Sequence, residues 1–224
     1  MIDPRVLDKM TKYMTSEYGN AASNEHVFGW NANEAVNIAR EKISNSINCS
    51  PNEIYFTSGA TESNNLAILG ALNLKGDNSH VISLKTEHKS IIDILNFASK
   101  NNVNTTLLDV KKDGIIDLEL FEKSITSNTK FVSIMMANNE IGVIQPIDEI
   151  SKICKSHNII LHVDAAQALG KIKLDLMNLN IDLMSLSAHK IYGPKGIGAL
   201  YINSKTMKNR IKAITYGGGH ENGL

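Results

Sequence analysis

Short apolar runs alternate with amphipathic helical patterns along almost the whole chain of 224 residues. Apolar runs of this length are typical of buried strands, and the segments between them place apolar residues at helical spacing, as at Ile38, Ile43 and Ile47. Such alternation predicts an α/β fold with three layers, αβα, in which helices cover both faces of a mostly parallel central sheet. The predicted strands span residues 53–57, 81–85, 105–109, 131–135, 159–163, 183–186 and 198–202, and the predicted helices span 5–18, 34–47, 61–74, 90–100, 118–125 and 147–156.

Composition narrows the possible roles of this domain. Lys+Arg and Asp+Glu number 23 each, so the formal net charge is zero, which argues against a nucleic-acid or membrane-surface role. No apolar run approaches the length of a membrane span, and the first residues do not resemble a signal peptide. The two cysteines, Cys49 and Cys154, lack metal-ligand spacing. We therefore expect no metal site, and a reduced, cytoplasmic protein, or one of the mitochondrial matrix if the source is eukaryotic.

Lys190 is the first candidate for chemistry. It follows the strand pattern 183–186 and precedes a turn that contains Gly193, Gly196 and Gly198. Glycines let backbone or a ligand approach closely, and a lysine that is partly desolvated there becomes a usable amine nucleophile. Taken alone, a lysine at a strand end is more often a solvated surface charge. The string GPKGIG lacks the Gly-Lys-Ser/Thr ending of a nucleotide phosphate loop, and no helical pattern follows it directly.

A second candidate, Asp164, follows the strand pattern 159–163, with Gln167 three residues further on. A carboxylate at the end of a strand can pair with a protonated pyridine nitrogen. An aspartate together with a Schiff-base lysine is the usual signature of pyridoxal phosphate (PLP). Asp164 and Lys190 together therefore point to PLP as cofactor.

Six motifs in chain order resemble those of cysteine desulfurases, which are class V aminotransferases of PLP fold type I. They are FTSGATESNN (56–65), TEHKS (86–90), NNEIGVIQPI (138–147), HVDAAQALGK (162–171), SAHKIYGPKGIGALY (187–201) and GGGHENG (217–223). The likeness is greatest to the type that serves iron–sulfur cluster assembly. It implies L-cysteine as substrate, L-alanine and a protein-bound persulfide as products, a homodimer, and an iron–sulfur scaffold or another sulfur acceptor as partner.

The resemblance also implies a role for each matching residue. Lys190 corresponds to the lysine that forms the internal aldimine with PLP and then acts as general base, and His88 to the histidine that stacks on the ring and assists proton transfer. Asp164 corresponds to the partner of the ring nitrogen. The remaining matches are to phosphate-binding residues (Ala60, Thr61, Ser187 and His189) and to residues that contact the 3-hydroxyl oxygen (Asn139 and Gln167).

Plainer interpretations of three of these positions stay open at the level of sequence. The segment from Ser58 to Thr61 joins a strand to a helix and is equally compatible with a phosphate-binding nest and with an ordinary capping box. A lone histidine such as His88 is more often structural or exposed than catalytic. Asn139 would also serve as a turn former beside Gly142.

Residues 1–224 are expected to form one unit, the PLP-binding large domain. Cys49 is expected in an exposed polar turn and Cys154 partly buried on a helix, and neither matches the family's catalytic cysteine. In the family a short segment precedes the counterpart of Asp3, and a smaller domain with that cysteine follows the GGGHENGL sequence. We therefore expect this chain alone not to release sulfur from cysteine. The alternatives are a catalytically incomplete PLP-binding fragment and another fold-type I enzyme, such as an aminotransferase, a selenocysteine lyase or a kynureninase.

Overall fold

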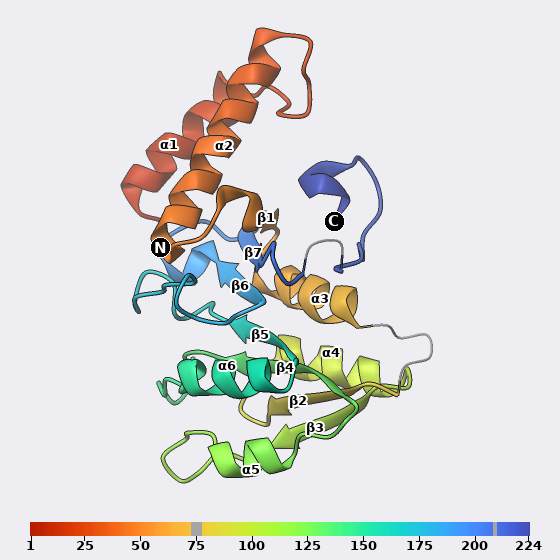
Figure 1. Cartoon of the computed structure of the whole chain (residues 1–224). Coiled ribbons are helices and arrows are strands. Elements are labelled where there is room, and N and C mark those ends of the chain that lie inside the picture. Colours follow the sequence, from red (N-terminus) through yellow and green to blue (C-terminus); the bar gives the residue numbers. More distant parts are fainter. Residues whose placement is uncertain (73–77, 208–209) are drawn as a thin grey trace.

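The strands of the chain form one seven-stranded sheet in the order β1-β7-β6-β5-β4-β2-β3 (Figure 1). The computed structural model describes residues 1–72, 78–207 and 210–224. β7 runs antiparallel to both of its neighbours, β1 and β6, and all other pairings between these strands are parallel. The strands are β1 (Ile54–Thr57), β2 (His80–Leu84), β3 (Asn104–Leu108), β4 (Thr129–Met135), β5 (Ile160–Asp164), β6 (Leu183–Ser187) and β7 (Gly198–Ile202). The predicted mostly parallel sheet is confirmed.

Every predicted helix is present, with differences at the ends. The helices are α1 (Pro4–Thr15), α2 (Val27–Ile47), α3 (Ala60–Ala71), α4 (Lys89–Ser99), α5 (Leu118–Lys123) and α6 (Ile147–Ser156), with short 3₁₀ helices η1 (Pro51–Glu53), η2 (Ala188–Lys190) and η3 (His220–Gly223). The predicted start of α2 at residue 34 was wrong, because His26 caps the helix earlier by accepting the backbone N–H of Gly29 at Nδ1 (3.1 Å). Residues 73–74 of the predicted helix 61–74 lie outside the described residues.

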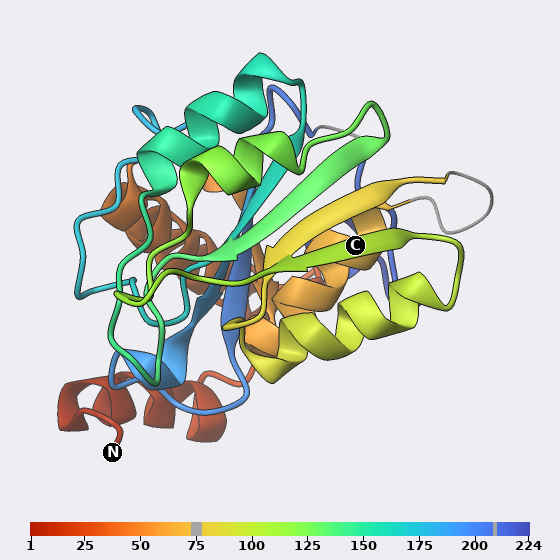
Figure 2. The same cartoon turned by 90° about the horizontal axis from the view of Figure 1, so that it is seen from below.

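Helices cover both faces of the sheet (Figures 1 and 2). Because successive side chains of a strand point to opposite faces, Val81 and Phe131 pack toward α3 and α4, and their neighbours Ile82 and Val132 pack toward α5 and α6. Each face thus has its own apolar core. This arrangement confirms the three-layer αβα fold.

The first two helices add little to these cores. In the described part of the chain, α1 buries none of its residues, and α2 buries only Gly29, Ser44 and Ile47. Figure 1 shows α2 extending away from the sheet at the β1 end of the molecule. Several large apolar side chains are exposed on this part of the chain: Leu7, Met14, Tyr18, Phe28 and Trp30.

Parallel pairing brings the carboxyl ends of most strands to the same edge of the sheet. β1, β2, β4, β5 and β6 all end there, and the antiparallel strand β7 begins there. In open α/β sheets, ligands bind in the crevice outside the carboxyl ends of the strands. We therefore expect a ligand-binding site among the turns at this edge.

We predict that Gly198→Ala destabilises the protein by about 1–3 kcal/mol or more, because the added carbon has no room. A Cβ at this first residue of β7 would lie 2.6 Å from Gly59 Cα and 2.6 Å from the carbonyl oxygen of Leu186, which are both backbone atoms. Gly142→Ala is the control, since a Cβ there meets no described atom within 4 Å and only its positive φ of 70° is unfavourable. Urea unfolding compares the two variants. An equal loss of unfolding free energy in the two variants would show that β7 is not tightly packed against the turn after β1.

Candidate active site

A cavity of about 390 Å³ lies at the carboxyl edge of the sheet. The turns after β1, β2, β4, β5 and β6 all contribute to its lining. Every residue that the sequence singled out for the site lines this cavity, namely Ala60, Thr61, His88, Asn139, Asp164, Gln167, Ser187, His189 and Lys190. Residues up to 130 positions apart in sequence are thus brought together around one space.

The N-terminus of α3 forms one wall of the cavity. Its N-cap residue is Gly59, and no described side chain caps the helix. The first helical hydrogen bond runs from the Ser63 N–H to the Gly59 carbonyl (3.1 Å), so the N–H groups of the first turn have no intrahelical acceptor. The capping-box alternative does not hold, because Gly59 has no side chain with which to cap the helix. A helix N-terminus left open in this way attracts an anion.

Ser187 and His189 lie at the end of β6 and line the same cavity. Ser187 is 2% exposed, and its Oγ lies 2.8 Å from His189 Nδ1. Partial burial, together with the charges of Lys190 and Lys195, lowers the pKa of His189, so its imidazole is neutral at neutral pH. A hydroxyl and a neutral imidazole are suitable hydrogen-bonding partners for a phosphate group.

Lys190 is exposed at the rim of the cavity and is therefore a solvated lysine, not a partly desolvated one. β6 ends at Ser187, and the single 3₁₀ turn η2 carries Lys190 beyond the edge of the sheet. The chain then turns sharply, with Tyr192 in the left-handed region (φ 64°). The lysine amine is accessible to a ligand from solvent.

Asp164 is a buried carboxylate in the lining of the cavity, 3% exposed. Its Oδ1 accepts the backbone N–H of Ala166 (3.0 Å), and its Oδ2 accepts the side-chain amide of Asn64 (3.0 Å). Burial raises the pKa of Asp164, and these two hydrogen bonds and the nearby His88 partly offset that rise. Within residues 1–72, 78–207 and 210–224, no lysine, arginine or histidine forms an ion pair with Asp164. A ligand with a cationic N–H would complement this carboxylate.

Asn139 and Gln167 present amide groups to the cavity. The turn-forming bonds of this segment are made by Asn138, whose Oδ1 accepts the N–H groups of Glu140 and Ile141 (2.9 and 3.1 Å). Asn139 is therefore not needed as the turn former. Gln167 Oε1 accepts a hydrogen bond from Lys171 Nζ (2.6 Å), which leaves the amide nitrogen as the donor for a ligand.

His88 is the N-cap of α4 and lies at the cavity surface. Its Nδ1 accepts the backbone N–H of Ser90 (3.1 Å) and lies 2.8 Å from Ser90 Oγ. Because Nδ1 is engaged by Ser90, Nε2 is the ring nitrogen that remains for a ligand.

Two buried polar residues behind the cavity, Asn64 and Glu87, were missed by sequence reasoning. Glu87 Oε1 accepts the Met135 N–H (2.8 Å), while Glu87 Oε2 and Asn64 Oδ1 are buried without a partner among the described residues. Burial, and secondly the charge of Asp164, raise the pKa of Glu87 well above its ordinary value. Glu87 therefore takes up a proton more readily than Asp164, whose two hydrogen bonds favour its charged form. A signal for Asn64 did exist, since at helical spacing it shares a face with Ala60, Ala67 and Ile68.

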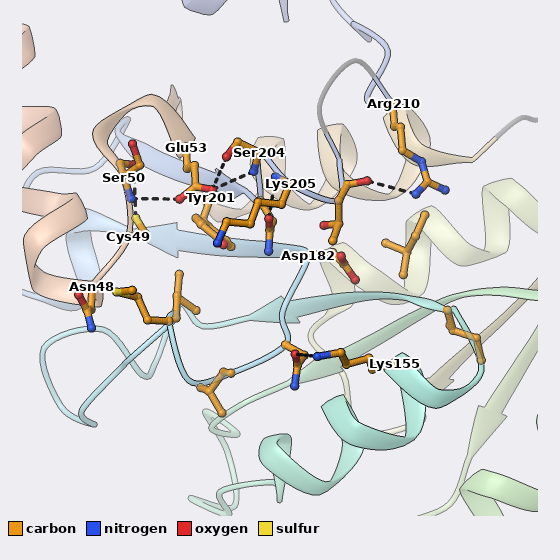
Figure 3. Close-up of a pocket in the computed structure, with 18 of the residues that line it drawn as sticks. Asn48, Cys49, Ser50, Glu53, Lys155, Asp182, Tyr201, Ser204, Lys205 and Arg210 are labelled. Carbon is orange, nitrogen blue, oxygen red and sulfur yellow. Dashed lines mark hydrogen bonds between the residues drawn. The ribbon is translucent and has the colours of Figure 1, made fainter.

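A larger cavity of about 940 Å³ lies at the opposite edge, near the start of β5 and the end of β7 (Figure 3). Several of its charged side chains are bonded to other residues of the chain. Glu53 accepts hydrogen bonds from Ser50 and Ser204, and Lys155 Nζ donates to Asn180 Oδ1 (2.7 Å). These bonds engage the carboxylate of Glu53 and the ammonium group of Lys155 within the chain.

The two cysteines are not placed for chemistry in the smaller cavity, since neither lines it. Cys49, expected to be exposed, is half-buried in the wall of the larger cavity. Cys154, expected to be partly buried, is fully buried on α6. Burial raises the pKa of both thiols to about 12, so both are protonated at neutral pH.

The described residues contain no cluster of histidine, cysteine, aspartate and glutamate suited to a metal ion. In the same parts of the chain, no helix combines the length and the apolar character needed to cross a membrane.

An open helix N-terminus, a buried carboxylate and a lysine at the carboxyl edge of a mostly parallel sheet are features expected of α/β enzymes that use PLP. The chain belongs to the aminotransferase class-V family, which matches residues 1–222.

Named relatives refine this assignment. The chain is 52% identical over 225 residues to "Cysteine desulfurase IscS" of Dechloromonas aromatica (strain RCB), covering 100% of this chain and 55% of the relative. It is 50% identical over 226 residues to "Cysteine desulfurase, mitosomal" of Trachipleistophora hominis, covering 100% and 51%. The solved structure "SspA in complex with cysteine" matches with a TM-score of 0.95 and 38% identity, covering 100% of this chain and 64% of that one. The chain thus spans about half the length of the curated relatives it matches.

We predict that Glu87→Gln stabilises the protein increasingly as the pH rises above 4.5, the ordinary pKa of this carboxyl. Because the folded-state pKa is raised, the stability that protonated Glu87 contributes is fully present below pH 4.5 and is lost as the pH rises toward the folded-state value. A glutamine keeps the acceptor for Met135 and has no proton to lose. Over this interval the variant should gain about 1.4 kcal/mol per pH unit relative to the wild type. Urea unfolding over a pH series measures the difference. A difference that does not change with pH would contradict a protonated Glu87.

Proposed function

We propose that this chain is the PLP-binding large domain of a cysteine desulfurase. The enzyme converts L-cysteine to L-alanine and delivers the sulfur as a persulfide for iron–sulfur cluster assembly. One observation carries the proposal: the residues that match the desulfurase site, scattered from Ala60 to Lys190, all line the same cavity of about 390 Å³. The names of the relatives and the solved structure that holds cysteine support this substrate class.

The residues of the cavity fit PLP in chemistry. The N-terminus of α3 with Thr61, and on the other side Ser187 and His189, would hold the phosphate. Asp164 would accept a hydrogen bond from the ring nitrogen, and His88 would lie against the ring. The amides of Asn139 and Gln167 would bind the 3-hydroxyl oxygen. When bound, PLP supplies an electron sink for negative charge that develops at the α-carbon of the substrate.

Lys190 and Asp164 have distinct proposed tasks. The Nζ amine of Lys190 would be the nucleophile that holds the cofactor covalently, and as a free amine it would accept the proton from the α-carbon of the substrate. Asp164 would hold the proton on the ring nitrogen, since its two hydrogen bonds favour the charged carboxylate. The exposed position of Lys190 lets its amine meet an incoming ligand.

The thiolate that attacks the substrate sulfur is proposed to be neither Cys49 nor Cys154. Neither lines the cavity, and both thiols have a raised pKa that keeps them protonated. We infer that the attacking cysteine belongs to another part of the complete enzyme.

We further propose that the enzyme is a homodimer and acts in the cytoplasm of a bacterium or in an organelle of mitochondrial type. The exposed apolar side chains on α1 and α2, including Phe28 and Trp30, support an interface with another chain or domain. The sources of the relatives, a bacterium and a mitosome, support the location.

We predict that borohydride reduction of the PLP-loaded protein attaches the label to Lys190. Lys195 lines the same cavity and is the matched control, so Lys195→Ala should keep the label and Lys190→Ala should lose it. Peptide mapping by mass spectrometry locates the modified residue. A label found on Lys195, or on any other lysine, would refute the proposed attachment.

We predict that Asp164→Asn lowers turnover of cysteine by about 10²-fold or more, while PLP stays bound. The reason is that a carboxylate holding the ring-nitrogen proton matters most when negative charge develops in the transition state. Glu87→Gln is the control, because it changes a neighbouring carboxyl that is already neutral, and its turnover should stay within a few-fold of the wild type. Alanine formation and cofactor absorbance are measured on the complete enzyme. Normal turnover by Asp164→Asn would exclude this role.

A further inference from the structure

We propose that Asn64 is a positioning residue that, through Ser90, fixes the tautomer of His88 and so presents an Nε2–H donor to the cavity. The ligand-binding roles of His88 and Asp164 rest on the proposed function, which assigns no role to Asn64 or Ser90.

The side chain of Asn64 lies fully buried on the side of α3 that faces the sheet. Its Nδ2 donates to Asp164 Oδ2 (3.0 Å) and to Ser90 Oγ (3.0 Å). Two hydrogens on one nitrogen are thus shared between two elements, the end of β5 and the first turn of α4. The amide oxygen has no partner among the described residues.

Asp164 determines which way this amide points. An ionised carboxylate can only accept hydrogen bonds, so the nitrogen of Asn64 must face Asp164. The opposite orientation would place the amide oxygen against the carboxylate oxygen, and would leave two buried acceptors facing each other. The orientation with an unpartnered oxygen is therefore the favourable one.

The orientation of Asn64 sets the direction of the hydrogen bond between Ser90 and His88. Because Ser90 Oγ accepts from Asn64, its own proton is available for His88 Nδ1, which lies 2.8 Å away. The backbone N–H of Ser90 donates to the same nitrogen (3.1 Å). Nδ1 receives two donors and so carries no proton. A neutral imidazole then has its proton on Nε2.

This chain of donors has a consequence for the ligand. With Nδ1 held by Ser90, the ring of His88 is restrained, and Nε2–H is the ring group left to donate to a ligand in the cavity that His88 lines. Without Asn64, the Ser90 hydroxyl would be free to rotate, and one of the restraints on the ring would be lost. Loss of positioning at a group that contacts the reacting centre lowers the rate without removing any catalytic atom.

The test measures the tautomer of His88 directly by ¹⁵N NMR of the imidazole nitrogens in the cofactor-free protein. The spectra are recorded over a pH series, and the neutral form of the wild-type ring should show Nδ1 with the signal of an unprotonated nitrogen and Nε2 with that of a protonated one. In Ser90→Ala and Asn64→Leu the backbone N–H of residue 90 remains a donor to Nδ1, so the two signals should move part of the way toward each other, as expected when one of two restraints on the tautomer is lost. Ser90→Thr keeps the hydroxyl and should retain the wild-type signals.

A second measurement follows the complete, PLP-loaded enzyme. Asn64→Leu and Ser90→Ala should lower kcat by roughly 10- to 100-fold with little change in KM, and Ser90→Thr should restore most of kcat. Unchanged imidazole signals in Ser90→Ala would overturn the inference, even if Asn64→Leu failed to fold. Because the NMR experiment needs no cofactor, its failure is distinct from a failure of Lys190 labelling, which would refute the proposed function alone.

Discussion

The arrangement of the site depends on one buried carboxylate, Asp164 at the end of β5. Burying an ionised group is costly unless hydrogen bonds or an opposite charge compensate. The chain supplies two such bonds, from the Ala166 backbone and the Asn64 side chain, and it keeps the neighbouring Glu87 protonated, so that two negative charges do not lie side by side. Among the described residues, no cationic side chain forms an ion pair with Asp164. A ligand with a cationic N–H would therefore complement this carboxylate from the cavity side.

The sheet makes this site possible because it collects short turns from distant parts of the chain. Parallel pairing of β5 with β4 and β6 puts the ends of all three strands at one edge. β7 enters the same edge from the opposite direction and passes so close to the turn after β1 that only a glycine fits at Gly198. The open N-terminus of α3 is a consequence of the same turn, since Gly59 has no side chain with which to cap the helix. Gly59 thus takes part in the close packing against β7 and also leaves the N-terminus of α3 open.

Cavity size alone does not identify the site in this protein. The hollow at the amino edge of the parallel strands is more than twice as large as the one at the carboxyl edge. Several of its charged groups, such as Glu53, have partners within the chain. In the described part of the chain, the smaller cavity offers a helix N-terminus without a side-chain cap and a carboxylate without an ion-pair partner. Polar groups that have no hydrogen-bonding partner within the folded chain favour ligand binding. A ligand displaces only water from such groups and does not have to break a hydrogen bond of the protein.

The amino-acid sequence by itself determined the fold class and the positions of the candidate site residues. The alternation of buried side chains, as in Val81 and Ile82, follows directly from strand geometry, and polar residues at the ends of parallel strands converge wherever the sheet forms. Only the tertiary structure decided the order of the strands, the exposure of Lys190, the proton on Glu87 and the orientation of Asn64. These features depend on which groups meet across the fold. Local spacing carries no information about such neighbours, because desolvation and hydrogen bonding are set by residues far apart in the chain.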